Sequence, residues 1–147
     1  MDLYTIGFTQ KTAEQFFNLV KINNIKKVID TRLNNVSQLS GFAKKNDLKY
    51  FLSELCCCEY IHIPDLAPTK EILKPYQEKK INWQQYEDKF LNLMSQRNIE
   101  KYINEDYFDN VCLLCSEHQP HFCHRRLVAE YLKRYNSNLT INHLVKL

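Results

Sequence analysis

The residues best suited to chemistry lie in one short stretch, Val111–Arg126, with the sequence VCLLCSEHQPHFCHRR. It brings thiols, a carboxylate, imidazoles and two adjacent guanidinium groups close together in the chain. Carboxylates and imidazoles act as general acids and bases, and arginines bind phosphates and carboxylates through paired hydrogen bonds. The stretch therefore predicts a catalytic or anion-binding site.

Two elements must position these side chains. Val111–Cys115 is an uninterrupted apolar run, which is typical of a strand buried on both faces. After Phe122, apolar residues recur with the period of a helix that buries one face. In an open parallel sheet, ligands bind beyond the carboxyl ends of the strands, where helix N-termini carry partial positive charge. The side chains expected in this zone are Glu117, His118, His121, Cys123, His124 and Arg125.

A second strand contributes another candidate pair. Lys26–Arg32 is predicted to form a strand, with Asp30 and Arg32 near its end. Residues two apart on a strand point to the same face, so this pair can project together toward the same crevice. The alternative is that the two side chains form only a salt bridge or cap a helix.

The remaining elements alternate between strands and helices. A first strand, Leu3–Ile6, ends at Gly7, and Thr12 with Gln15 forms a capping box for the next helix. Gly7 predicts either a positive φ, a close backbone approach or an ordinary turn. The further elements predicted are a helix over 42–55, a strand over 59–63, a short helix over 71–78, a long helix capped by Asn82 and a closing strand over 140–144.

This alternation predicts an α/β fold in which residues 1–147 form a single domain. The expected architecture has three layers, with an open, mostly parallel, Rossmann-like sheet covered by helices on both faces. Along the long helix, Trp83, Tyr86, Phe90 and Leu93 recur at helical spacing. This stripe is more typical of a core-facing surface than of a platform for stacking a ligand.

The composition narrows the class of protein and its partners. A net charge of +3, with 44% hydrophobic and 25% charged residues, is ordinary for a globular protein and permits an anionic small molecule or a nucleic acid as partner. We expect no membrane association, because no apolar run approaches 18 residues and the first residues do not resemble a signal peptide. The expected location is the cytoplasm, and the sequence does not indicate an oligomeric state.

The six cysteines predict reduced thiols or a metal site rather than a disulfide framework. Cys112 and Cys115 are three apart on a strand and point to opposite faces, so they do not form a zinc knuckle. Cys115, His121, Cys123 and His124 could converge on a metal, but their spacing matches no standard zinc pattern. We expect no stoichiometric zinc. Cys123 precedes a helix and is followed by His124 and Arg125, which favours either a nucleophilic thiol or a packing and capping role.

Four motifs along the chain resemble one known family. They are Thr5-Ile6-Gly7-Phe8-Thr9, Asp30-Thr31-Arg32, Leu66-Ala67-Pro68-Thr69, and Cys115-x-Glu117-x-x-Pro120-x-x-Cys123-His124-Arg125. Their order and spacing resemble the family catalogued as domain of unknown function 488, over nearly the whole chain. The resemblance implies a small α/β fold with a shared pocket, and it implies no particular activity.

Two hypotheses follow for the function. The first is an enzyme that acts on a phosphorylated, nucleotide-like or nucleic-acid substrate, with arginines to bind the anion and a carboxylate as general base or nucleophile. With two glycines the chain has neither a P-loop nor a dinucleotide fingerprint, so side chains and helix termini would have to hold the phosphates. Its predicted catalytic residues are Glu117, Asp30, His124 and Cys123, and its predicted ligand-binding residues are Arg32, Arg125, Thr9 and Cys115. The second is a non-catalytic ligand- or nucleic-acid-binding module that uses the same pocket. The sequence identifies no cofactor, reaction or substrate.

Overall fold

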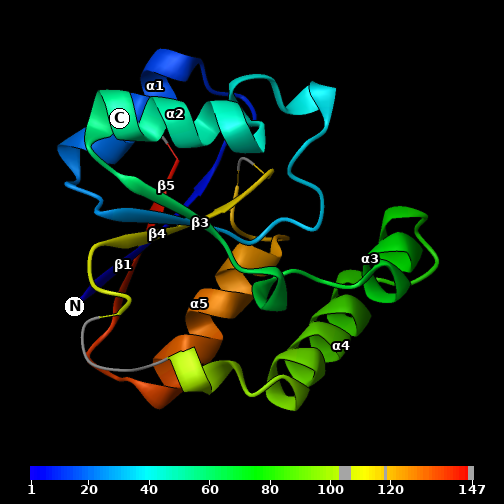
Figure 1. Cartoon of the computed structure of the whole chain (residues 1–147). Helices are drawn as coiled ribbons and strands as arrows, with labels where there is room; N and C mark the ends of the chain where they lie inside the picture. The colour runs from blue at the N-terminus through cyan, green and yellow to red at the C-terminus, as the bar shows by residue number, and fades with distance from the viewer. Residues whose placement is uncertain (103–106, 118, 146–147) are drawn as a thin grey trace.

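A computed structural model of the chain, which describes residues 1–102, 107–117 and 119–145, contains one five-stranded parallel sheet (Figure 1). The strands are β1 (Asp2–Gly7), β2 (Lys27–Asp30), β3 (Glu59–His62), β4 (Val111–Cys115) and β5 (Thr140–Leu144). Their order across the sheet is β3-β2-β4-β1-β5. The predicted α/β fold is confirmed, and every described strand pair is parallel.

Helices cover both faces of the sheet, as the alternation of elements predicts. Helices α1 (Ala13–Ile22) and α2 (Lys45–Cys56) lie on one face, and α5 (His124–Tyr135), α4 (Trp83–Gln96) and α3 (Lys70–Gln77) lie on the other (Figure 1). Short 3-10 helices, η1 (Gln38–Ala43), η2 (Pro64–Leu66) and η3 (Ile99–Tyr102), connect these elements. No described helix has the length and apolar character needed to cross a bilayer.

The alternating side chains of the strands build two separate hydrophobic cores. On the α1 and α2 face, Val28, Cys112 and Leu114 pack against residues such as Phe16 and Leu52. On the α4 and α5 face, the core contains Leu3, Ile29, Leu113, Phe90 and Leu127. The apolar run of β4 is buried at every position because it feeds both cores.

Local sequence signals explain where the helices begin. Thr12 accepts a hydrogen bond from the Gln15 backbone N–H while the Gln15 side chain accepts one from the Thr12 N–H, so the predicted capping box is present. Asn82 and Gln85 form the same arrangement at the start of α4. Such reciprocal caps satisfy backbone donors that have no partner within the helix.

The carboxyl ends of β1 and β2 lie level with the carboxyl end of β4, which pairs with both strands. Its final residue, Cys115, pairs in register with Gly7 of β1, and Leu114 pairs with Asp30 of β2. The chain after each of these strands therefore leaves from the same edge of the sheet. This edge also faces the start of α5, so the residues expected to form a site meet there.

Candidate functional site

A cavity of about 700 Å³ opens at this edge, between the loop after β4, the start of α5 and the helices α3 and α4. Its volume is within the range of small-molecule sites in proteins. On the sheet side it is lined by Arg32, Cys115, Glu117, Cys123 and His124. On the helix side it is lined by Lys70, Lys74, Tyr76, Trp83 and Phe122.

The structure places five of the eight predicted site residues in the lining of this cavity and three outside it. Arg32, Cys115, Glu117, Cys123 and His124 contribute to the lining. Asp30, Thr9 and Arg125 are not among the lining residues. Asp30, at the end of β2, and Glu117, just after β4, do lie at the same edge of the sheet, because the two strands are adjacent and parallel.

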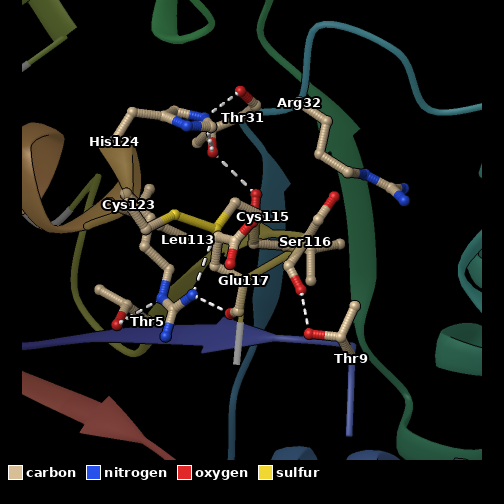
Figure 2. The surroundings of a disulfide bond; sticks show 12 residues. Thr5, Thr9, Thr31, Arg32, Leu113, Cys115, Ser116, Glu117, Cys123 and His124 are labelled. Carbon is tan, nitrogen blue, oxygen red and sulfur yellow. Dashed lines mark hydrogen bonds between the residues drawn. A yellow bond between two sulfur atoms is a disulfide. The ribbon is translucent and has the colours of Figure 1, made fainter. Parts of the chain in front are cut away.

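Asp30 and Arg32 form a buried ion pair with each other. The Arg32 Nε and Nη2 atoms donate to the two Asp30 carboxylate oxygens, each at 2.9 Å, and Nη2 also donates to the Ala43 carbonyl. The Tyr60 hydroxyl donates to Asp30 Oδ2 at 2.5 Å. Asp30 is 0% exposed and Arg32 is 3% exposed. In Figure 2 the Arg32 side chain points away from the cysteines and His124. This geometry favours the salt-bridge alternative for the pair.

His124, the first residue of α5, is held in place by Thr31, which directly follows strand β2. Its Nε2 atom lies 2.6 Å from the Thr31 carbonyl and 3.0 Å from the Thr31 hydroxyl, which itself donates to the Leu114 carbonyl. Nε2 must therefore carry the proton, and Nδ1 is left as an acceptor. Burial lowers the pKa of His124 to about 4. The ring is neutral at physiological pH and can serve as a base or a hydrogen-bond acceptor.

Arg125 occupies the centre of the edge and is completely buried. Its Nε donates to the Thr5 hydroxyl at 3.2 Å, and its Nη1 contacts Cys115 Sγ at 3.2 Å and donates to the Glu117 carbonyl. Burial lowers its pKa to about 10, so the side chain remains a cation at neutral pH. The guanidinium thus connects α5 to strands β1 and β4.

Gly7 makes this arrangement sterically possible. A Cβ atom at this position would lie 1.5 Å from the Glu117 carbonyl oxygen and 2.9 Å from Arg125 Nη1. Its φ is not in the left-handed region, which among the glycines only Gly41 occupies. Of the roles predicted for this glycine, the close backbone approach is therefore the one that the structure confirms.

Cys115 and Cys123 are joined by a disulfide bond, which corrects the prediction that all six thiols are reduced or bind metal (Figure 2). The sequence reasoning missed it because the two cysteines belong to different elements, and only the loop after β4 returns Cys123 to the end of that strand. The free cysteines are Cys56, Cys57, Cys58 and Cys112. Cys112 packs into the α1 and α2 core, on the opposite face of β4 as expected. While the bond is intact, Cys123 has no thiol to act as a nucleophile.

Glu117 and Thr9 have different roles in the loop after β4. Glu117 is exposed and lines the cavity, while its backbone carbonyl rather than its carboxylate holds Arg125. Thr9 donates both its hydroxyl and its backbone N–H to the Ser116 carbonyl, at 2.7 and 3.2 Å. Thr9 therefore positions the loop from outside the cavity.

The aromatic side of the cavity was not predicted as part of the site. Trp83 contacts Phe122 at 5.4 Å and Tyr76 at 5.6 Å between ring centroids, and it stacks on Tyr86 at 5.1 Å. Tyr86 is 2% exposed, as the core interpretation of this stripe requires, but the half-buried Trp83 also lines the cavity. The sequence did contain a signal for this side of the cavity. Residues 64–69 leave β3 at the carboxyl edge of the sheet and lead directly into α3.

The described residues contain no group of three or more His, Cys, Asp or Glu side chains able to hold a metal ion. His118 lies outside the described residues, and His121 is not among the cavity-lining residues. The absence of stoichiometric zinc therefore stays a prediction.

The fold and the site define an α/β protein with a parallel sheet and a ligand-sized cavity at the carboxyl edge of its strands. A family model described as "Domain of unknown function DUF488" matches residues 12–132. The chain belongs to this family, which confirms the resemblance seen in its motifs. Neither the search of the curated proteins nor that of the solved structures finds a significant match.

Proposed function

We propose that the cavity binds a phosphorylated, nucleotide-like ligand and that the protein is an enzyme acting on it. The observation that carries this proposal is the composition of the two cavity walls. One wall offers aromatic rings and lysines together with Glu78, which pairs with Lys74 at 3.8 Å, and the other offers a carboxylate and a neutral imidazole. Such a division suits a ligand with a flat ring at one end and an anionic group at the other.

The aromatic wall supports the ring end of such a ligand. Phe122 is 62% exposed, and its ring meets Trp83 edge-on, so a planar base can contact both. Stacking on aromatic side chains contributes about 1–3 kcal/mol per base and tolerates different bases. Lys70 and Lys74 stand on α3 beside this wall, and both are exposed enough to meet a phosphate.

The opposite wall supports the chemistry. Glu117 is exposed at the mouth of the cavity and is the candidate general base, because its carboxylate is not needed to hold Arg125. His124 presents a neutral imidazole whose Nδ1 is available as an acceptor. Asp30 and Arg32 contribute as a fixed ion pair, of which Arg32 lines the cavity. A role for Cys123 as nucleophile requires its reduced form.

Trp83 makes the binding test direct, because it is the single tryptophan of the chain and lies in the cavity wall. Nucleoside monophosphates should quench or shift its emission on titration, and the matching nucleosides and sugar phosphates should bind more weakly. Phe122→Ala should weaken binding about 5- to 150-fold, which corresponds to the stacking contribution of about 1–3 kcal/mol. Tyr50→Ala is the matched control, since Tyr50 is 61% exposed but lies on α2.

A second pair of variants tests the phosphate end. Lys74→Gln should weaken binding of the monophosphate more than that of the nucleoside, and the difference should shrink as salt is added. Lys133→Gln, on an exposed position of α5, should change neither. If no nucleotide alters the emission of Trp83, or Phe122→Ala binds like wild type, the proposed ligand is wrong.

The non-catalytic module remains the second candidate, because the buried Asp30–Arg32 pair shows that part of the predicted machinery is a fixed ion pair. Mass spectrometry of the bound nucleotide after incubation distinguishes the enzyme from the non-catalytic module. An enzyme should alter the nucleotide, and Glu117→Gln should abolish that change while the Trp83 signal on binding persists. A nucleotide that binds and is recovered unchanged would favour the module.

A further inference from the structure

We propose that Cys115 and Cys123 form a reversible dithiol–disulfide couple, oxidised by small hydroperoxides that enter through the cavity. This proposal concerns a modification site and does not depend on the ligand proposed above. It rests on three features of the molecule, namely where the two sulfur atoms lie, what surrounds them, and how the other four cysteines are placed.

The position of the bond favours exchange with small molecules over a purely structural role. Both cysteines are nearly fully buried, at 1% and 3% exposure, yet both line the wall of the cavity. The cavity therefore gives a small oxidant or reductant a route to the two cysteines. The bond closes a loop of separation 8 in sequence, between the end of β4 and the start of α5. Both elements are already anchored by the sheet and by Arg125.

The surroundings favour a thiolate at Cys115 when the bond is open. Arg125 Nη1 lies 3.2 Å from Cys115 Sγ, and this guanidinium is a cation at neutral pH. An adjacent arginine lowers the pKa of a thiol and increases the thiolate fraction, which is the reactive form. Cys123 is the N-cap residue of α5, and its side chain makes no capping hydrogen bond in the described structure, so its sulfur can approach Cys115.

Two of the four remaining cysteines are buried and poorly placed to compete. Cys112 is completely buried in the opposite core, and burial raises its pKa. Burial also raises the pKa of Cys58 to about 12. Oxidation is therefore directed to the one pair that combines a neighbouring cation, access through the cavity and a second sulfur within bonding distance.

The oxidation balances in two steps. The Cys115 thiolate attacks the terminal oxygen of the hydroperoxide, the O–O bond breaks, and the alkoxide takes the proton that the thiol released, leaving a sulfenic acid. The Cys123 sulfur then attacks Cys115 Sγ, the S–O bond breaks, and the hydroxide leaves as water with the Cys123 proton. An external dithiol returns the two electrons by thiol–disulfide exchange.

Thiol counting on the whole protein tests the proposal. The folded protein is reduced, treated with hydroperoxide, then acid-quenched, denatured and alkylated with iodoacetamide. Intact mass should show six alkyl groups in the reduced sample and four in the oxidised one, matching the six cysteines and the four free ones. The tryptic peptide over residues 102–125 should be lighter by two hydrogens and carry its alkyl group at Cys112. Reductant added to the folded oxidised protein should restore six.

Two variants assign the roles. Cys123→Ser should stop the reaction at a sulfenic acid on Cys115, detected as a dimedone adduct, while Cys57→Ser, at an exposed site, should still lose two thiols. The oxidation rate should rise with pH to a midpoint below the free-cysteine value of about 8.5. Six alkylated thiols after hydroperoxide, or a bond that reductant cannot open without denaturant, would overturn the proposal. These wild-type counts decide the question even if a variant does not fold.

Discussion

Asp30→Asn should strongly destabilise the protein without altering the shape of the side chain. The substitution removes the negative charge that accepts two 2.9 Å hydrogen bonds from Arg32 and one from Tyr60. Arg32 is 3% exposed, so water cannot solvate its charge once the carboxylate is removed. Breaking a buried pair by removing one partner costs about 3–5 kcal/mol. For a chain of this length, that corresponds to a melting point lower by roughly 6–20 °C.

The assay is urea unfolding followed by circular dichroism, with Asp47→Asn as the matched control. Asp47 pairs with Lys44 at 3.9 Å on the surface and should contribute only about 0–1 kcal/mol. The double variant Asp30→Asn, Arg32→Met should recover much of the loss, because no unpaired buried charge remains. A loss below about 1 kcal/mol for Asp30→Asn, or no recovery in the double variant, would refute the reasoning.

Three further predictions concern the loop after β4 and the start of α5. Gly7→Ala should lower the free energy of unfolding by about 1–3 kcal/mol in urea titrations, because the new Cβ would overlap the Glu117 carbonyl. An unchanged free energy of unfolding would contradict that close approach. Glu117→Gln should leave the melting temperature nearly unchanged, as the exposed carboxylate stabilises no described ion pair, and a fall of about ten degrees in thermal unfolding would instead indicate a structural role. The third prediction is a pH dependence: the pKa of His124 is about 4 when folded and about 6.5 when unfolded, so the unfolded chain binds the proton first as the pH falls. Stability should therefore decrease by up to about 3 kcal/mol between pH 6.5 and pH 4, and His124→Gln should flatten this decrease in urea titrations across that range.

The fold could be predicted from the sequence wherever a signal is local. The apolar run Val111–Cys115 identified the central strand, and the pairs Thr12 with Gln15 and Asn82 with Gln85 marked two helix starts. Such signals depend on the period of a strand or helix and on backbone donors at helix ends, which a few neighbouring residues determine. The placement of charged residues at the carboxyl edge followed from the same elements.

The contacts inside the site could not be predicted, because they depend on the order of the strands. The hydrogen bond from Tyr60 to Asp30 exists because β3 lies beside β2, and the disulfide exists because the loop after β4 turns back over its own strand. Trp83 reaches the cavity through the packing of α4 against α5. Nothing in the spacing of these residues along the chain distinguishes such neighbours from residues on opposite sides of the sheet.

The place of β1 between β4 and β5 bears on how the chain folds during its synthesis. Its partners begin at Val111 and Thr140, more than a hundred residues after β1 has been made. At translation rates of about 5–20 residues per second, β1 waits roughly 5–20 s for β4 with both of its edges unpaired. Contacts so distant in sequence also slow folding of the completed chain. The nascent chain should therefore depend on chaperones or early packing of α1 to keep this apolar strand from pairing with other chains.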